Sequence, residues 1–343
     1  MQITTVGLDL AKHIFQVHVV DAAGHVVARK RLRRGEVLSF FTGLSPWMIG
    51  MEACATAHHW ARELIKLGHI VKLMPPAYVK PYVKRQKNDM ADAEAICEAV
   101  TRPTMRFVPI KSAEQQSVLM LHRVRALLIR QRTMLVHALR GHLAEFGIIV
   151  AQGISRIREL IQLLTDESAD AALSPLARRA LAPLVDQLLD LQPRIRALEA
   201  ELLIWHRQSQ ESRRLETIPG VGFITATAIA ATVTDPSQFR SGREFAAWLG
   251  LTPRPNSSGG KERLGRISKM GNGYLRTLLA VGATAVIRYA RTRTAAGTGW
   301  INSLLSKKPV RLVSMALANK TARIAWALLA RGEVYQSPAP AAG

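Results

Sequence analysis

Apolar segments alternate with turn residues through the first hundred positions, and this pattern predicts a domain of mixed strands and helices. Short apolar runs bounded by glycine, proline or aspartate are typical of strands, whereas apolar positions three and four residues apart are typical of helices. The pattern predicts strands at 3–8, 14–20 and 25–32, a helix at 36–42, a strand at 47–51, a helix at 57–67, a strand at 69–74 and a helix from 89 to about 101. A hairpin-led mixed sheet flanked by helices follows from this order.

The predicted order is that of an RNase H-like domain, and it gives a meaning to four acidic residues. Asp9 and Glu52 each follow a predicted strand, while Asp89 and Asp92 open a predicted helix and share one face of it. Carboxylate oxygens are the ligands that Mg²⁺ prefers, and two such ions bind the attacking and leaving oxygens of a phosphodiester. By itself the helical pair fits better as acids that favour a helix N-terminus. The metal site therefore depends on the predicted fold.

From about residue 112 to residue 205 the pattern changes to that of long helices. A first apolar stripe comprises Leu121, Val124, Leu128, Leu135, Leu139, Leu143 and Phe146, and a second comprises Leu184, Leu188, Leu191, Ile195, Leu198 and Leu202. The second stripe has the spacing of a coiled-coil seam, and Pro193 inside it predicts a kink or a restart of the helix. Such a seam fits an intrachain helical hairpin or a dimer interface, and the sequence leaves both open.

The last third of the chain combines a glycine turn with mainly helical segments. The run Ile218-Pro-Gly-Val-Gly222 before a predicted helix at 223–233 resembles a helix-hairpin-helix turn, in which Gly220 and Gly222 let the backbone approach a phosphate. A tight turn without a ligand is the alternative. Further helices are predicted at 274–289 and about 310–331, and residues 337–343 are predicted to be disordered.

The charge of the chain points to a polyanionic partner. Lys and Arg number 47 against 25 Asp and Glu, a net charge of +22. Between residues 252 and 331 a single acid, Glu262, faces fifteen basic residues, an imbalance that favours a phosphate-binding surface. With only Cys54 and Cys97, a disulfide framework or a cysteine zinc site is not expected. The absence of a signal-peptide or membrane-spanning pattern predicts a cytoplasmic protein with no membrane partner.

Several motifs together resemble the DEDD-type transposases of bacterial insertion sequences, a family of bridge-RNA-guided serine recombinases. The matching motifs are Gly7-Leu-Asp9-Leu-Ala-Lys12, Met51-Glu52-Ala53, Lys87-Asn-Asp89-Met-Ala-Asp92-Ala93, Ile218-Pro-Gly-Val-Gly222, Gly250-Leu-Thr-Pro253 with Ser257-Ser258-Gly259, and the stretch 265–271. Two departures stand out: Asn88 replaces a more usual threonine, and Glu52 is followed by Ala-Cys-Ala rather than Ala-Thr-Gly. All four carboxylates are present, and the resemblance covers nearly the whole chain.

The resemblance implies a two-part active site. A RuvC-like domain would hold two Mg²⁺ ions through Asp9, Glu52, Asp89 and Asp92, and a C-terminal transposase domain would supply Ser258 as the nucleophile that forms a phosphoserine intermediate. Ser257 is the rival nucleophile. Double-stranded DNA of the element ends and the target, a non-coding guide RNA and further copies of the chain, as a dimer or tetramer, are the implied partners, close to the bacterial nucleoid.

The resemblance also divides the chain and suggests contact residues. The expected parts are a metal-binding domain at 1–108, a helical dimerisation region at 109–210, a transposase domain at 211–335 and a tail at 336–343. Predicted nucleic-acid contacts are Lys12, Gly220, Gly222, Arg254, Lys261, Arg263, Arg266 and Lys269. His58 and His59 fit a structural role better than a metal site, because adjacent helical residues point in different directions. A junction-resolving endonuclease with water as nucleophile, and a non-catalytic binding protein, are the alternative functions.

Overall fold

The structure is a computed structural model that describes residues 3–84, 89–153, 156–166, 173–256, 263–292 and 299–336. The chain forms two compact units, Met1–Gln116 and Ser117–Gly343. The expected division into a metal-binding domain, a helical region, a transposase domain and a tail remains a prediction. The predicted disordered tail at 337–343 lies outside the described residues.

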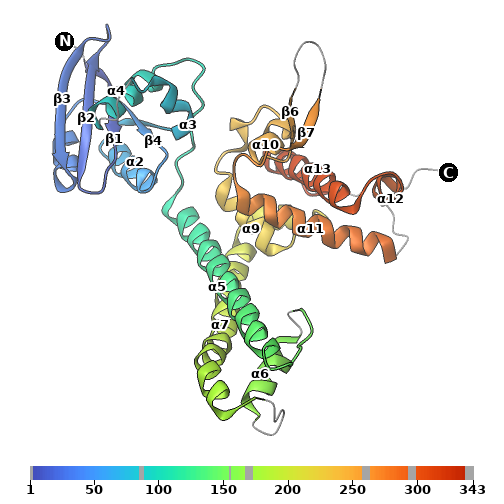
Figure 1. The fold of residues 1–343 in the computed structure, drawn as a ribbon. Coiled ribbons are helices and arrows are strands. Elements are labelled where there is room, and N and C mark those ends of the chain that lie inside the picture. The colour runs from blue at the N-terminus through green and yellow to red at the C-terminus, as the bar shows by residue number, and fades with distance from the viewer. Residues whose placement is uncertain are drawn as a thin grey trace. The chain divides into compact units, whose positions relative to one another are not determined.

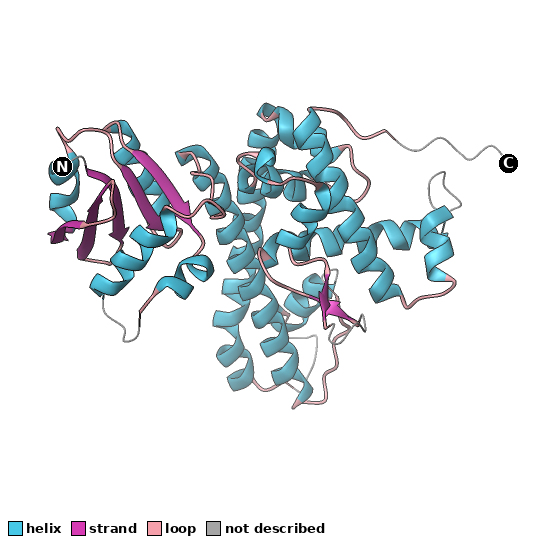
Figure 2. Ribbon diagram, turned by 90° about the horizontal axis from the view of Figure 1, so that it is seen from above, coloured by secondary structure: helices cyan, strands magenta, loops and turns pink. Residues whose placement is uncertain are grey.

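The first unit is a five-stranded mixed sheet with helices on both faces (Figures 1 and 2). Its elements are β1 (Ile3–Asp9), β2 (Ile14–Asp21), β3 (Val26–Arg33), η1 (Arg34–Glu36), α1 (Val37–Phe41), β4 (Met48–Glu52), α2 (Ala57–Lys66), β5 (Ile70–Met74), α3 (Pro76–Val79), η2 (Lys80–Tyr82) and α4 (Asp89–Val100). The strand order is β3-β2-β1-β4-β5. The β1–β2 and β2–β3 pairs are antiparallel, whereas β4 is parallel to both β1 and β5. The predicted hairpin-led mixed sheet is confirmed.

The two faces of this sheet carry different residues. The face covered by α1 and α2 is mainly apolar, and the buried side chains of its core include Val6, Leu8, Phe15, Val17, Val19, Leu32, Phe41 and Trp60. The opposite face packs against α4 and carries Gly7 and Gly50, with Thr5, Gln16 and His18 as buried polar residues. Successive residues of a strand point to opposite faces, so this division follows from alternation along β1 and β2. One face forms a large apolar core, whereas the other combines a smaller apolar cluster around Met74 and Ile96 with glycines and buried polar residues.

The second unit is mainly helical (Figure 1). Its elements are α5 (Ala113–Ala144), which begins in the last residues of the first unit, α6 (Ile157–Thr165), α7 (Pro175–Gln208), α8 (Gln210–Glu216), α9 (Phe223–Thr232), η4 (Pro236–Gln238), α10 (Gly242–Trp248), β6 (Pro253–Pro255), β7 (Leu264–Ile267), α11 (Gly273–Thr292), α12 (Gly299–Leu305) and α13 (Val310–Arg331). None of the described helices is both long and apolar enough to cross a membrane. A mixed α/β N-terminal region with a helical C-terminal region, as predicted, is the observed class.

Helices α5 and α7 pack together within one chain, which settles that an intrachain hairpin exists. Leu139 and Leu143 of α5 share a core with Val185 and Leu188 of α7. Arg125 of α5 pairs with Glu199 of α7 at 2.7 Å. Of the two outcomes predicted at Pro193, a kink or a restart, the restart is wrong, since the helix runs from Pro175 to Gln208 with that proline inside it.

The stripe predicted on α5 is correct only in part. Leu139 and Leu143 are fully buried, but Val124 and Phe146 are 39% and 41% exposed. The buried surface of the helix instead includes Val118 and His122. Apolar periodicity does not predict that a polar residue such as His122 is buried, because its burial depends on tertiary contacts.

His122 joins α5 to two helices of the C-terminal region. Its Nδ1 lies 3.0 Å from the Tyr274 hydroxyl of α11, and its Nε2 lies 3.1 Å from Thr227 Oγ1 of α9. Burial, assisted by the charge of Arg125, lowers the pKa of His122 to about 4. The ring is therefore neutral near pH 7 and serves as a structural link between three helices.

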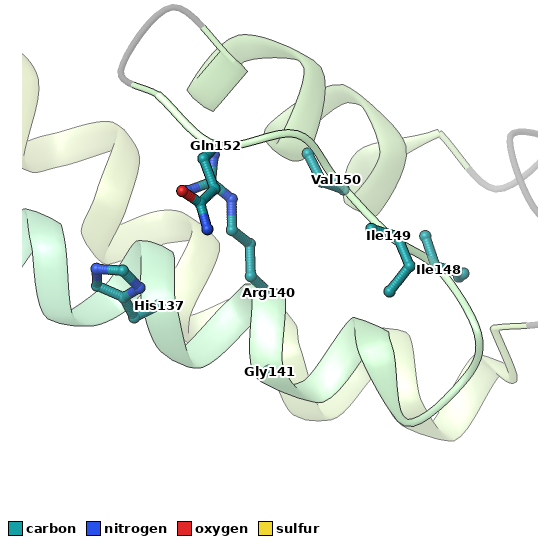
Figure 3. A pocket seen from close by; sticks show the side chains of 7 residues that line it. All are labelled: His137, Arg140, Gly141, Ile148, Ile149, Val150 and Gln152. Atoms are coloured by element: carbon teal, nitrogen blue, oxygen red, sulfur yellow. The ribbon is translucent and has the colours of Figure 1, made fainter.

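A pocket is formed where the loop after α5 folds back on that helix. It has a volume of about 310 Å³ and is lined by His137, Arg140, Gly141, Ile148, Ile149, Val150 and Gln152 (Figure 3). Arg140 Nη2 donates to the carbonyl oxygens of Ala151 and Gly153 at 2.6 and 3.3 Å. Because these donations fasten the loop to the helix, the pocket is a consequence of local packing.

Candidate active site

Two adjacent parallel strands carry the first two predicted site residues at their carboxyl ends. Asp9 is the last residue of β1 and Glu52 is the last residue of β4. The two strands pair in parallel, with Gly7 opposite Gly50. Asp9 and Glu52 each follow their glycine by two positions, so both side chains lie on the face of the sheet that the glycines share. Both are half-buried.

Helix α4 lies against this face at a distance that only glycine permits. A Cβ added at Gly7 would come within 2.1 Å of the Ala93 carbonyl oxygen, and one added at Gly50 within 2.8 Å of Val100 Cβ. The helix therefore passes over both strands, with its N-terminal turn toward the strand ends. That turn contains Asp89 and Asp92, which the close approach brings toward Asp9 and Glu52. Asp92 is half-buried and Asp89 is exposed.

The electrostatic effects of the carboxylates show that they share one region. Burial first, and then the charges of Asp92 and Asp89, raise the pKa of Asp9 to about 6, against a smaller lowering by the Leu10 N–H. Burial likewise raises the pKa of Glu52, followed by the charges of Asp9 and Asp92. Like charges brought together disfavour ionisation unless a cation balances them. The predicted convergence of these four residues is thus consistent with their mutual influence.

The donor set suits a hard divalent cation in charge and in ligand type. Carboxylate oxygens are the preferred protein ligands of Mg²⁺, and a cation among them would offset the repulsion that raises their pKa values. Within the described part of the chain, however, no three metal-ligating side chains are grouped closely enough to form a ready-made site. The fit is therefore one of donor chemistry and charge rather than of a completed coordination sphere.

The loop after Glu52 has an unusual backbone. Thr56, the residue before α2, adopts φ 71°, a left-handed conformation that costs free energy for a β-branched residue. Between them, Cys54 has a raised thiol pKa, owing first to partial burial and then to Glu52 and Asp9. The thiol is accordingly protonated near pH 7 and is not a nucleophile beside the carboxylates. A strained turn next to candidate ligands is typical of a functional site.

The predicted nucleophile belongs to a segment that the structure does not describe. Ser258, its rival Ser257 and the predicted phosphate contact Lys261 all lie outside the described residues. On either side of them, β6 and β7 pair antiparallel, with Pro255 opposite Leu264. β6 and β7 therefore form a short hairpin, and in the sequence the serine motif falls between these two strands.

The residues around this hairpin are held by tight backbone contacts. A Cβ at Gly250 would lie 2.1 Å from the Met270 carbonyl oxygen, and one at Gly271 would lie 1.8 Å from that of Trp248. Both glycines have positive φ, as has Lys269 at 56°. The two glycine motifs of the sequence thus pack against each other and fix the base of the β6–β7 hairpin.

The predicted nucleic-acid contacts occupy different environments. Arg263, Arg266 and Lys269 are exposed around the β6–β7 hairpin, and Lys12 is exposed between β1 and β2. Arg254 donates through Nε and Nη2 to the Ser268 carbonyl oxygen at 3.2 and 2.9 Å, which braces the hairpin.

The glycine turn between α8 and α9 gives its two glycines different surroundings. A Cβ at Gly220 would lie 2.8 Å from the carbonyl oxygen of Gly282 in α11, so its close approach is to that helix. Gly222, in contrast, is exposed with open space around its Cα and precedes the first turn of α9. Of the two, Gly222 is the one whose surroundings leave room for a phosphate.

Sequence reasoning missed the residues that position the acids. Gly7 and Gly50 were visible only as parts of motifs, yet they allow α4 to approach the sheet. Arg29 of β3 forms an ion pair with Glu94 of α4 at 3.9 Å and so links the outer strand to the same helix. The signal for these glycines was their position two residues before each strand-end acid, a spacing that becomes meaningful once the strands are known to be neighbours.

Comparisons with known proteins agree with these motifs. A family model described as "Transposase IS116/IS110/IS902 family" matches residues 212–297, and a transposase model for the DEDD domain of IS110 matches residues 6–148. The chain is 49% identical to "Probable family 20 transposase" of Pseudomonas aeruginosa, over 98% of this chain and 99% of that protein. It is 47% identical to "Putative transposase y4pF/y4sB" of Sinorhizobium fredii, over 98% of this chain and 86% of that protein.

A third relative is named for a specific mobile element. The chain is 40% identical to "Transposase for insertion sequence element IS1111A" of Coxiella burnetii, over 97% of this chain and 92% of that protein. Similarity of this extent includes both the acidic motifs of the first unit and the glycine motifs of the second. The chain therefore belongs to the IS116/IS110/IS902 family of transposases, enzymes that cleave and rejoin DNA.

Proposed function

We propose that this transposase cleaves DNA at an RNase H-like metal centre formed by Asp9, Glu52, Asp89 and Asp92. The observation that carries the proposal is electrostatic: in addition to burial, the charges of Asp92 and Asp89 raise the pKa of Asp9, and those of Asp9 and Asp92 raise the pKa of Glu52. This influence between carboxylates of β1, β4 and α4 supports a shared cation. The hairpin-led strand order β3-β2-β1-β4-β5 supports the RNase H-like assignment.

In this proposal the chain contributes ligands and their orientation. Two Mg²⁺ ions, when bound, supply Lewis-acid polarisation of the phosphodiester and stabilise the attacking and leaving oxygens. Asp9 and Glu52 present their carboxylates from adjacent strand ends, and the glycine contacts of α4 hold Asp92 near them. The half-buried position of Asp9 and Glu52 restricts the water around them and strengthens their attraction for a cation.

We further propose that Ser258 is the nucleophile. Its Oγ attacks phosphorus and loses its proton, the bond from phosphorus to one deoxyribose oxygen breaks, and that oxygen leaves as a hydroxyl. The phosphoserine ester retains the energy of the phosphodiester, so a second DNA hydroxyl attacks it to rejoin the strand. The family motif around Gly259 and the tightly packed base of the β6–β7 hairpin support this assignment.

Target choice is proposed to come from a non-coding guide RNA. The sequence shows no helix-turn-helix or zinc-finger pattern for reading bases, its basic residues suit phosphate contacts, and base pairing supplies sequence selection in other guided systems. The protein is proposed to act as a dimer or tetramer. RNA that co-purifies with the protein is expected to map beside its own coding region, and a random sample of cellular RNA would contradict guidance.

Covalent capture tests the serine and the metal separately. We expect wild-type protein with Mg²⁺ and junction DNA to form a protein–DNA adduct that survives denaturation, and Ser258→Ala to lose it. Ser257→Ala is the matched control and keeps the adduct. Cleavage by Ser258→Ala at the wild-type rate, with no adduct in any protein, would instead favour a junction-resolving endonuclease that uses water.

Substitution of the helical acids tests the metal centre. Asp89→Asn and Asp92→Asn are expected to abolish cleavage while DNA binding, which depends on basic residues, persists. Glu98→Gln is a suitable control, because Glu98 is an exposed acid at the far end of the same helix and pairs with Arg102. Wild-type cleavage by both aspartate variants would remove the basis for the metal site.

A further inference from the structure

The outer strand of the first unit carries basic residues in a regular alternation. β3 has the sequence Val-Val-Ala-Arg-Lys-Arg-Leu-Arg from Val26 to Arg33 and forms one edge of the sheet. Arg29, Arg31 and Arg33 occupy alternate positions, so all three point to the same face. Lys30 points to the other face, where its Nζ lies 5.1 Å from the centre of the Phe40 ring. The arginines therefore share one face and the lysine is separated from them.

The face of the arginines is the face of the candidate active site. Across the sheet, Asp9 is paired with Gln16 of β2, and Gln16 is paired with Arg31 of β3. Residues directly opposite each other in neighbouring strands lie on the same side of a sheet. Asp9, Gln16 and Arg31 thus form one row across three strands. In the adjacent row, Gly7 is followed by His18 and Arg29.

The opposite charges in this row are not paired with each other. Two strand intervals of about 4.8 Å place the Arg31 backbone about 10 Å from that of Asp9, and no ion pair joins the two side chains within the described residues. The uncharged Gln16 lies between them and is almost fully buried, at 6% exposure. The carboxylates are consequently left for a cation, and the guanidinium is left for an anion.

The three arginines differ in the partners already available to them. Arg29 is paired with Glu94 of α4, which also receives a bond from Lys84. The exposed Arg31 side chain makes no hydrogen bond or ion pair with any residue in the described ranges. Arg33 is exposed at the end of the strand. Charged edge strands also prevent unwanted strand pairing, but that role requires no preference for one face.

We propose that Arg31 and Arg33 bind backbone phosphates of the DNA strand that is cut at the carboxylate site. The proposal rests on the function proposed above and adds a surface for the substrate strand. A distance of about 10 Å corresponds to roughly three nucleotides, at about 3.4 Å of axial rise per nucleotide. Guanidinium groups suit this task because they offer two parallel donors to a phosphate. The strand then runs between the edge of the sheet and Asp9.

A salt titration of DNA binding tests the surface without requiring catalysis. The full-length protein is mixed in EDTA with a fluorescent DNA duplex of about 30 base pairs, and the dissociation constant is measured against salt concentration. The double variant Arg31→Gln/Arg33→Gln is expected to reduce the slope of log K against log salt by about 1.8, since each lost phosphate contact changes it by about 0.9. Its melting temperature and circular dichroism should match the wild type.

Lys30→Gln is the matched control, because it removes one charge from the same strand on the opposite face. The wild-type slope in the control, with a reduced slope in the double variant, supports the proposal. An unchanged slope in the double variant, or an equal loss per charge in Lys30→Gln, overturns it. The same titration with duplex RNA distinguishes the ligand, and a loss confined to RNA also overturns the proposal.

Neutral phosphates locate the contact. A set of duplexes is prepared, each with one methylphosphonate at a different position. Wild-type protein is expected to bind more weakly when either of two neighbouring phosphates is replaced. The affinity of the double variant is expected to be unchanged by replacement at these two positions. Equal sensitivity of both proteins at every position contradicts the proposed contact. This binding measurement is independent of the cleavage reaction. If the wild-type protein shows the expected pattern of methylphosphonate sensitivity but does not cleave DNA, the proposed function is refuted and the proposed DNA contact is still supported.

Discussion

The two faces of the N-terminal sheet are built from the same strands and have opposite properties. The face under α1 and α2 buries Leu8, Phe15 and Val17 in a continuous apolar core. The face under α4 has Gly7, Gln16 and His18 at the corresponding central positions and ends in Asp9. Each glycine on this face forgoes a side chain that would bury apolar surface, and each buried polar group must be compensated.

This difference separates stability from function within a single sheet. Apolar residues on the first face supply the free energy that allows acidic and polar residues to be kept on the second. Because neighbours along a strand point to opposite faces, a one-residue step from Leu8 to Asp9 passes from one role to the other. Substitutions at adjacent positions are therefore expected to have different effects on stability and on DNA cleavage.

The largest expected effect is the contrast between Asp9→Asn and Leu8→Ala. Asp9→Asn removes a ligand and is expected to slow DNA cleavage on the order of 10³-fold, because a metal ion supplies several kcal/mol of transition-state stabilisation. Leu8→Ala leaves the ligands in place and is expected to cost about 2–5 kcal/mol of unfolding free energy. Cleavage rates and urea denaturation, measured well below the melting temperature, check both. A Leu8→Ala protein that is folded but inactive would contradict the separation of the two faces.

The next effect concerns the distance between α4 and the sheet. Gly7→Ala places a Cβ 2.1 Å from the Ala93 carbonyl oxygen, so the helix must move. We expect a loss of about 1–3 kcal/mol of unfolding free energy, typical of overpacking, together with weaker binding of Mg²⁺ in calorimetry. Gly35→Ala is the control, since a Cβ at Gly35 meets nothing within 4 Å. Mg²⁺ binding by Gly7→Ala as tight as that of the wild type would show that the metal site does not require the close contact between α4 and the sheet.

A smaller effect is expected in the pH dependence of stability. The pKa of Asp9 is about 6 in the folded protein, against an ordinary value of 3.8. The folded state therefore binds the proton more tightly than the unfolded state. This contribution to the free energy of unfolding is complete below about pH 4 and is lost as the pH rises through 6. Without divalent cations, Asp9→Asn should therefore gain stability relative to the wild type between pH 4 and pH 7, measured by urea denaturation. Millimolar Mg²⁺ should reduce this gain by stabilising the charged carboxylates of the wild type.

Asp21 provides a control of the opposite sign. The N–H groups of His25 and Ala23 lower the pKa of the Asp21 carboxyl, so its contribution is present above about pH 4 and lost on acidification. Asp21→Asn should thus lose stability relative to the wild type as the pH rises from below 4 to 7. If the stability of Asp9→Asn and Asp21→Asn, relative to the wild type, changed in the same direction with pH, the assignment of the pH effect to the carboxylates around Asp9 would be contradicted.

The smallest effect is expected at Trp60, on the apolar face. Its buried indole Nε1 has no hydrogen-bond partner among the described residues, and its ring packs edge-on against Phe15 with a centroid distance of 5.0 Å. Trp60→Phe removes the unpaired donor but also some apolar area, so the two changes partly cancel and unfolding free energy should change by no more than about 1–2 kcal/mol. The rate of DNA cleavage should stay within about threefold of the wild type. A larger loss would show that this face contributes to catalysis.

Local patterns were sufficient to find most elements and to nominate the acids. The strand-end positions of Asp9 and Glu52 and the helical position of Asp89 followed from short apolar runs and turn residues. Local patterns did not predict the continuous helix through Pro193 or the burial of His122, because packing against other helices outweighs local preference. Nor did the sequence explain why Gly220 must be glycine, since its contact, Gly282, lies sixty-two positions away in α11.

The sequence by itself determined the chemistry that this protein has available: four carboxylates in family motifs, a basic C-terminal region and a serine motif between glycines. These properties belong to individual residues and their local spacing. Only the tertiary structure decided which residues share a face, because strand pairing sets Gly7 beside Gly50 and Asp9 in a row with Gln16 and Arg31. Strand register is a non-local property, because it is fixed by burial of the apolar face under α1 and α2. The same register sets which residues lie beside one another on the face under α4, and the apolar core therefore determines how the acids are arranged there.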